Sequence, residues 1–129
     1  MRRLLLDTHV LLWWWTDGDR LSDEALRTVA DPDTDVHVNA AGAWEISTLW
    51  RLGRIDHAPG AVHRFHELVA ADGFHHLAIT HLHCLRAGGY PAEHRDPFDR
   101  LLAAQSELEG LTLVTGDSAF TQFPAVVLW

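Results

Sequence analysis

Five short, largely apolar runs are spread along the chain, and each is shorter than an ordinary helix. Such a run is typical of a strand buried on both faces, as strands are in parallel sheets. Because segments with helical spacing lie between the runs, the pattern predicts an α/β fold in which helices cover both sides of a mainly parallel sheet. The predicted strands are Leu4 to Leu6, Val36 to Val38, Leu77 to Ile79, Leu111 to Val114 and Val126 to Leu128.

The segments between these runs carry the usual start and stop signals of helices. Ser, Asn and Asp are favoured at the N-cap, Pro at the first helical position and Gly just after the last. The stretch from Ala87 to Arg95 has the least regular pattern. The predicted helices run from a Ser22 cap to the turn at Asp31 to Asp33, from an Asn39 cap to near Gly53, from Pro59 to Val69, and from an Asp96 cap to Gly110.

Length and composition set the broad class of the protein. We interpret the 129 residues as one domain, residues 1–129, large enough to bury roughly two-thirds of its unfolded surface. Cys84 is the single cysteine, so the sequence offers no internal disulfide and no thiol zinc motif, which fits a reducing cytoplasm. The formal net charge of −8 is unusual for a protein that binds nucleic acid. Two divalent cations would offset about half of that charge.

The beginning of the chain resembles a secretory signal, because Arg2 and Arg3 precede a run rich in Leu and Trp. Asp7 and His9 interrupt that run and no small-residue cleavage site follows, so we expect no export signal. No stretch approaches the ~18 apolar residues that a membrane span requires. We therefore expect a soluble, cytoplasmic protein.

Four acidic residues fall where a predicted strand ends or where a predicted helix begins or runs. Asp7 and Asp117 follow strands, Asp99 lies in the first turn of a helix, and Glu45 lies in an otherwise apolar helix. In a parallel α/β sheet, ligands bind outside the carboxyl ends of the strands, at the point where the strand order reverses. The four carboxylates are therefore expected at one end of the sheet, where a hard divalent cation would make their crowding tolerable.

Local structure offers a second explanation for most of these acids. Asp7 is also placed to cap a helix that begins at Thr8, and Asp117 to cap the short segment that follows it. Asp96 and Asp99, with a Pro between them, match the N-cap and third position of a helix start. Glu45 has no such alternative, since a solvated helix face would carry more charge around it.

The chemistry that such a cluster supports is phosphodiester hydrolysis. Mg²⁺ binds oxygen ligands octahedrally and keeps several waters, which can be activated for attack on phosphorus. No protein nucleophile is needed. Thr115 is placed either to orient a metal-bound water through its hydroxyl or simply to end a strand.

Several short motifs together resemble PIN-domain ribonucleases, specifically the VapC-type toxins of type II toxin-antitoxin systems. The resemblance rests on L-D-T-H-V-L-L-W from Leu6, A-W-E-I from Ala43, L-G-R from Leu52, H-R-D-P-F-D-R from His94 and V-T-G-D from Val114. It implies a three-layer α/β/α sandwich with a central, mainly parallel five-stranded sheet. It also implies an endoribonuclease that depends on Mg²⁺ or Mn²⁺, with Asp7, Glu45, Asp99 and Asp117 as catalytic and metal-binding residues and Asp96 as an accessory acid.

The resemblance also carries expectations about partners. Proteins of this type are usually neutralised by a small VapB-like antitoxin and commonly form homodimers or toxin-antitoxin hetero-oligomers. Relatives often have a Lys four residues after the helix Glu, where this chain has Leu49. Contacts with RNA phosphates are therefore expected from arginines near the acids in sequence, namely Arg51, Arg54, Arg95 and Arg100.

Other readings of the sequence remain open. A haloacid-dehalogenase-like phosphatase would need a second Asp where His9 stands, and a receiver domain would need a Lys near its end. Zinc binding by the group His75, His76, His81, His83 and Cys84 fits no standard spacing. The main alternative is a catalytically inactive PIN-like module that engages a basic peptide through its acidic cleft.

The run Trp13 to Trp15 cannot lie wholly in the core, because consecutive helical positions point about 100° apart. We expect at least one of these rings at a surface, as a contact for a second protomer or an antitoxin or as a partly exposed aromatic.

Overall fold

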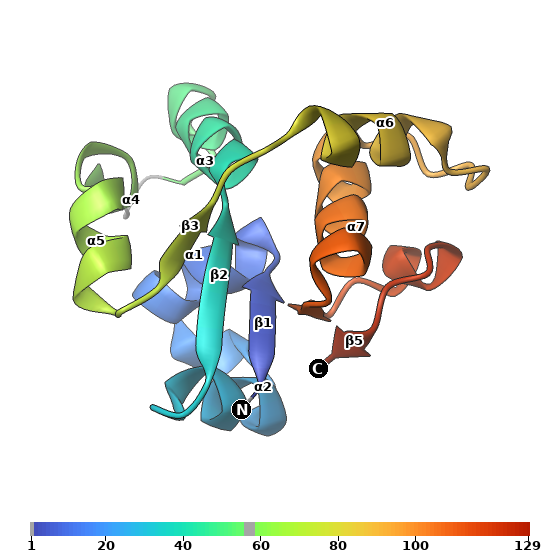
Figure 1. Cartoon of the computed structure of the whole chain (residues 1–129). Coiled ribbons are helices and arrows are strands. Elements are labelled where there is room, and N and C mark those ends of the chain that lie inside the picture. The colour runs from blue at the N-terminus through green and yellow to red at the C-terminus, as the bar shows by residue number, and fades with distance from the viewer. Residues whose placement is uncertain (1, 56–58) are drawn as a thin grey trace.

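The computed structural model describes residues 2–55 and 59–129, in which five strands form one sheet (Figure 1). The strand order is β3-β2-β1-β4-β5, and every neighbouring pair is parallel. The strands are β1 (Arg3–Leu6), β2 (Asp35–Asn39), β3 (His75–Leu77), β4 (Thr112–Val114) and β5 (Val127–Leu128). The α-helices are α1 (Thr8–Thr16), α2 (Asp23–Ala30), α3 (Ala40–Arg51), α4 (Pro59–His63), α5 (Phe65–Ala71), α6 (His81–Gly89) and α7 (Pro97–Glu109), with 3₁₀ turns η1 (Gly18–Arg20) and η2 (Ser118–Gln122).

The predicted α/β/α sandwich is confirmed by two hydrophobic cores, one on each face of the sheet. Successive residues of a strand point to opposite faces: Leu4 and Leu6 join the core that includes residues of α1, α2 and α5, while Leu5 joins the core that includes residues of α7. All three leucines are at most 2% exposed, and burying each contributes about 1.5–3 kcal/mol. The central strand is therefore fixed in register by its own side chains.

The predicted helix starts and one predicted stop are confirmed in detail. The Ser22 hydroxyl accepts a hydrogen bond from the Ala25 N–H at 3.1 Å, and the Asp96 carboxylate accepts from the Phe98 N–H at 2.8 Å. Helix α7 ends at Gly110, whose φ of 66° lies in the left-handed region, where glycine carries no steric cost.

Two predicted elements differ from the structure. The third strand covers His75–Leu77 rather than Leu77 to Ile79, because Thr80 caps α6 and the chain leaves the sheet before that helix begins. The helix predicted from Pro59 to Val69 is divided into α4 and α5. At Arg64, φ of −126° and ψ of 26° depart from helical values and interrupt the helix.

Helix α6 was not predicted at all. Its start is a capping box in which the Thr80 hydroxyl accepts from the His83 N–H while the His83 ring accepts from the Thr80 N–H. Glu or Gln usually fills the position that His83 occupies here. The start of α6 was therefore not recognised, because a histidine occupies the position of the usual Glu or Gln.

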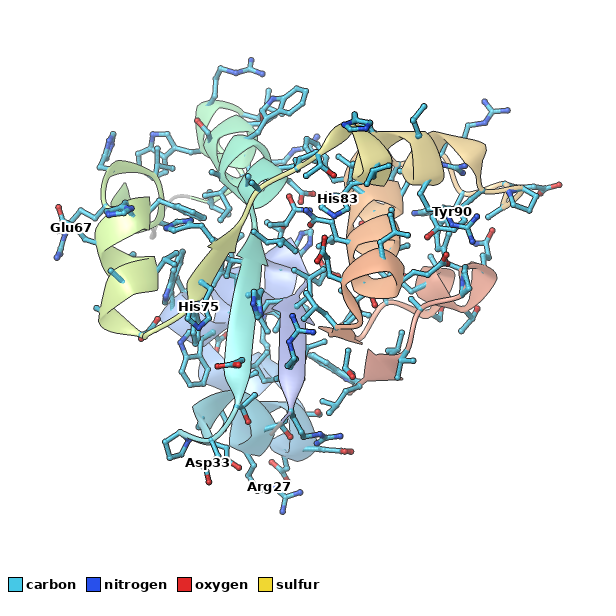
Figure 2. The ribbon with its side chains drawn as sticks, in the orientation of Figure 1. Arg27, Asp33, Glu67, His75, His83 and Tyr90 are labelled. Carbon is cyan, nitrogen blue, oxygen red and sulfur yellow. The ribbon has the colours of Figure 1, made fainter. Side chains whose placement is uncertain are left out.

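The strand order reverses between β1 and β4, because β2 and β3 extend the sheet on one side of β1 and β4 and β5 extend it on the other. In Figure 2, Asp33 and Arg27 lie at the end of the sheet where the parallel strands begin. The carboxyl ends of the strands are therefore at the other end of the sheet. The residues that follow β1 and β4 are thus brought together, as the topology rule predicts. None of the helices in the described residues is long and apolar enough to cross a membrane.

Candidate acidic site

Asp7 lies directly after the central strand and is 7% exposed. It is the N-cap of α1, with its Oδ1 accepting from the His9 N–H at 3.4 Å, so the capping role considered from the sequence is confirmed. Burial raises the pKa of Asp7, and the nearby charge of Asp117 raises it further, while hydrogen bonds from Thr115 and His9 oppose the shift. A bound cation would relieve the cost of keeping this buried carboxylate ionised.

Thr115 connects Asp7 with Asp117. Its hydroxyl donates to Asp7 Oδ2 at 2.7 Å and accepts from the Asp117 N–H at 3.1 Å. Thr115 is 1% exposed, and its one hydroxyl hydrogen is committed to Asp7. Thr115 therefore contacts the Asp7 carboxylate and the Asp117 backbone, and a role in orienting a metal-bound water stays a prediction.

Asp117 follows β4 by the turn through Gly116 and lies at the surface. Its Oδ1 accepts from the Ala119 N–H at 2.9 Å and so caps η2, which confirms the predicted local role. A cap leaves carboxylate lone pairs free, since each carboxylate oxygen has two acceptor sites.

Glu45 projects from α3 and is half-buried. Burial raises its pKa, a hydrogen bond with Thr8 opposes this, and the negative charges of Asp7 and Asp96 raise it further. The first turn of α3 lies beside the start of α1, and a Cβ added at Gly42 would make an ordinary van der Waals contact of 3.5 Å with the Thr8 hydroxyl oxygen.

Asp99 is held by His94, a residue that sequence reasoning left without a role. The His94 Nε2 atom lies 2.7 Å from Asp99 Oδ2, and the Asp99 side chain is 17% exposed. Burial, opposed by His94 and assisted by the charges of Asp96 and Asp7, raises the pKa of Asp99 to about 6. Asp96 itself is exposed and caps α7.

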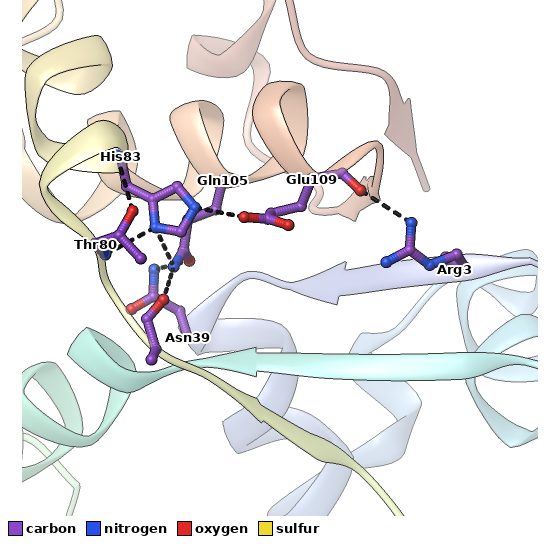
Figure 3. A network of polar contacts seen from close by, with 7 residues as sticks. Arg3, Asn39, Thr80, His83, Gln105 and Glu109 are labelled. Atoms are coloured by element: carbon purple, nitrogen blue, oxygen red, sulfur yellow. Dashed lines mark hydrogen bonds and ion pairs between the residues drawn. The ribbon is translucent and has the colours of Figure 1, made fainter.

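A polar network lies next to the start of α3 (Figure 3). The Asn39 side chain caps α3 through the Ala41 N–H and donates to Gln105 Oε1 at 2.6 Å. Gln105 is fully buried and donates in turn to the Ala78 carbonyl at 3.2 Å. On the far side, His83 contacts Glu109 at 2.9 Å. Helix α7 thus fixes the end of β2, from which the helix that bears Glu45 begins.

The electrostatic couplings connect the predicted acids into one cluster. Asp117 acts on Asp7, Asp7 acts on both Glu45 and Asp99, and Asp96 acts on the same two. Neighbouring carboxylates raise one another's pKa values, and a divalent cation is the simplest group that would neutralise their charges.

The donor set is composed of carboxylates, which suits Mg²⁺ or Mn²⁺. Among residues 2–55 and 59–129, no three His, Cys, Asp or Glu side chains converge closely enough to enclose an ion by themselves. This does not support the zinc group considered from the sequence, since His83 is engaged by Thr80 and Glu109.

The predicted arginine contacts fall into two groups. Arg51, Arg54 and Arg95 are exposed. Arg54 lines a cavity of about 450 Å³ that Leu49 also lines, so an arginine stands beside the position where the resemblance had implied a Lys. Arg100 instead donates to four backbone carbonyls, those of Ala87, Tyr90, Ala92 and His94. Its guanidinium is thereby committed to the last turn of α6 and the segment after it, and we remove it from the expected phosphate contacts.

The three consecutive tryptophans are all partly buried. Trp14 and Trp15 both donate from their indole nitrogens to Asp72 Oδ2, at 3.2 and 2.8 Å. Trp13 turns the other way and packs against Trp129, with ring centroids 6.2 Å apart. The expectation that these rings cannot all be core is confirmed.

A second cavity, of about 310 Å³, opens directly onto two of the acids. It is lined by Asp7, His9, Val10, Trp13, Arg20, Gly116, Asp117 and Trp129. No sequence pattern predicted that Arg20 or Trp129 would lie here, because neither residue belongs to an acidic motif. Only the pairing of β4 with β5 brings Trp129 to Asp117.

The chain is similar to known proteins over nearly its whole length. The family model of the PIN domain matches residues 4–126. Ribonuclease VapC22 of Mycobacterium tuberculosis is 31% identical over 118 residues, which cover 91% of this chain and 88% of that protein.

Solved structures have the same fold at lower identity. VapBC2 from Rickettsia felis, bound to a DNA fragment from its promoter, superposes with a TM-score of 0.71 at 13% identity, over 98% of this chain and 97% of that one. A toxin-antitoxin complex from Klebsiella pneumoniae gives 0.67 at 17% identity, over 97% and 96%. With the acids gathered at the switch point of a parallel sheet, these matches show that the chain belongs to the PIN-domain family, in the group of VapC-type ribonucleases.

Proposed function

We propose that this protein is a metal-dependent endoribonuclease, the toxin of a toxin-antitoxin pair. The observation that carries the proposal is the Thr115 hydroxyl bridge, which holds a buried Asp7 beside Asp117 at the switch point. Glu45 and Asp99 lie within the same electrostatic field. The identity to Ribonuclease VapC22 supports the choice of RNA as substrate.

Asp7 and Asp117 would be the central ligands of Mg²⁺ or Mn²⁺, with Glu45 and Asp99 completing the site. When bound, the ion would activate water and stabilise the charge that develops on the phosphate. The protein's own contribution is position: Thr115 orients Asp7, and His94 orients Asp99. Orientation by such outer partners typically changes metal affinity or activity by about 10- to 100-fold.

Arg51, Arg54 and Arg95 are the proposed contacts for RNA phosphates. A guanidinium can bind two phosphate oxygens at once, and all three side chains are exposed. Of these, Arg54 has the best support, because it lines the cavity that also contains His9, the neighbour of the acid site.

A VapB-like antitoxin is the proposed partner. The net charge of −8 favours binding of a basic segment of that partner across the acidic cleft. A homodimer, or a hetero-oligomer with the antitoxin, is part of the same proposal. It is supported by the toxin-antitoxin complexes among the structural relatives.

The test is cleavage of defined single-stranded RNAs by purified protein in Mg²⁺ or Mn²⁺, with and without EDTA. Asp7→Asn is the decisive variant, because an amide keeps the shape and the Thr115 contact but weakens the cation site. We expect cleavage by the parent, none in EDTA and at least a 100-fold loss in Asp7→Asn.

Equal cleavage by parent and Asp7→Asn would show that the activity is foreign to this site. Stable protein that neither cleaves RNA nor gains thermal stability from Mn²⁺ would instead support the inactive binding module considered from the sequence.

A further inference from the structure

We propose that Trp129, backed by Trp13, forms a nucleobase-stacking subsite next to the carboxylates, with Arg20 as its phosphate contact. The inference rests on the proposed ribonuclease function and specifies how a single-stranded RNA would be held. All three side chains line the 310 Å³ cavity that Asp7 and Asp117 also line.

Two tilted indole rings form one wall of this cavity. The centroids of Trp13 and Trp129 lie 6.2 Å apart with an interplanar angle of 56°, so the rings contact each other and leave no slot between them. Trp129 is 38% exposed. The exposed part of the Trp129 ring, beside the proposed phosphodiester-cleaving site, suits a base, because any base can stack on an aromatic ring.

Gly116 makes this position of Trp129 possible. A Cβ on Gly116 would stand 2.8 Å from Trp129 Cε2, which is closer than real Cβ atoms come, and 3.0 Å from Cζ2. The indole ring therefore lies directly on the turn between Thr115 and Asp117. A base stacked on Trp129 would place its sugar-phosphate next to the proposed metal ligand Asp117.

Arg20 supplies a positive charge for an RNA phosphate next to the acidic residues. Its guanidinium lies 5.7 Å from the Trp13 ring centroid, and its Nε is 3.4 Å from Asp17 Oδ2, with 63% of the side chain exposed. An exposed ion pair of this kind is worth about 0–1 kcal/mol, so a phosphate can replace Asp17 at little cost.

The same residues connect the two cavities. His9, Trp13 and Arg20 line both the 310 Å³ cavity and the 450 Å³ cavity that contains Arg54. A strand leaving the acids would therefore pass Arg20 and then Arg54. Alternating aromatic and guanidinium groups along a groove are typical of surfaces that bind single-stranded nucleic acid.

The experiment measures binding without cleavage. The Asp7→Asn protein is titrated, with Ca²⁺ present, into a fluorescent single-stranded 2′-O-methyl oligoribonucleotide and into the same backbone with abasic sites, by fluorescence anisotropy. In that background, Trp129→Leu is expected to weaken binding of the base-containing probe about tenfold, since stacking contributes ~1–3 kcal/mol per base. Binding of the abasic probe should stay within about twofold, and Trp129→Phe should restore most of the loss.

Gly116→Ala tests the geometry without removing a ring, and should reproduce the base-specific loss by displacing Trp129. Arg20→Gln should weaken both probes alike and flatten the salt dependence. Trp14→Leu is the matched control, on the helix α1 that also carries Trp13. The Trp14 ring packs on Phe74 and donates a hydrogen bond to Asp72, away from the residues described as lining either cavity. This variant should leave both affinities unchanged in folded protein.

Equal losses for the two probes, or no loss in Trp129→Leu, would overturn the stacking subsite, as would failure of the Asp7→Asn protein to bind either probe. If Trp129→Leu lost affinity for an arginine-rich peptide while its oligonucleotide binding was unchanged, the surface would be a peptide site. That result would also overturn the stacking subsite. Base-specific binding by a parent protein that does not cleave RNA would contradict the proposed nuclease function alone.

Discussion

The raised pKa of Asp99 leads to a stability prediction that can be tested before any activity is known. In the metal-free protein, the Asp99 side chain is 17% exposed and its pKa rises from 3.8 to about 6, with burial as the largest cause. The folded state therefore binds the proton more tightly than the unfolded state does. The resulting penalty is small near pH 4, grows as the pH rises through about 6, and is complete at neutral pH.

The magnitude follows from the size of the shift. A change from 3.8 to about 6 is roughly 2 units, and each unit corresponds to 1.36 kcal/mol. Since Asp96 and Asp7 share the effect and residual solvent screens it, we expect about 2 kcal/mol at pH 7.5. Asp99→Asn removes the charge and keeps an oxygen near His94, so this variant should be more stable than the parent by that amount in EDTA.

The assay is urea unfolding in EDTA at pH 4.5, 6 and 7.5, with parent and variant compared at each pH. The advantage of Asp99→Asn should increase steadily across the series and be about 1 kcal/mol smaller at pH 4.5 than at pH 7.5. Asp33→Asn makes the same change of charge at an exposed position at the other end of the sheet (Figure 2) and should show no such trend. A constant or negative difference for Asp99→Asn would refute the assignment of an electrostatic penalty to this carboxyl.

Two further substitutions test the positioning contacts. Thr115→Val removes the hydroxyl that donates to Asp7 and should lower RNA cleavage by about 10- to 100-fold, whereas Thr115→Ser should keep most of it; equal rates for the two variants would contradict this role. Arg100→Gln leaves carbonyls without their charged donor and should lower the free energy of unfolding by about 2–4 kcal/mol in urea titrations. A loss in Arg100→Gln confined to RNA binding, with unfolding unchanged, would instead restore the phosphate contact expected from the sequence.

The positions of the acids next to the strands were predictable, because each acid directly follows or lies close after a strand in the sequence. Asp7 and Asp117 each follow an apolar strand, and parallel strands deliver their carboxyl ends to one edge. Glu45 was predictable for the opposite reason, since an apolar helix gave it no structural role.

What the sequence could not provide were contacts between side chains distant along the chain or without a local pattern. His94 stands five residues before Asp99, a spacing across a helix start that predicts no contact. Arg100 lies in a motif rich in charge, where a phosphate contact was the natural expectation, and three of its four carbonyl partners lie in the irregular segment after α6. Trp129 reaches the site only through pairing of the last strand, which places it on Gly116.

The bridge from Asp117 through Thr115 to Asp7 has a direction as well as a position. A backbone N–H can only donate, so the Asp117 amide fixes the Thr115 oxygen as acceptor and leaves its hydrogen for Asp7. A protonated Asp7 oxygen at that contact would meet another hydrogen. The chain of donors is thus polarised one way, toward an ionised Asp7, and counteracts the burial that favours the neutral acid. Whatever reaches this edge of the sheet would meet a carboxylate whose Thr115 hydrogen bond favours the ionised form, against the larger effect of burial.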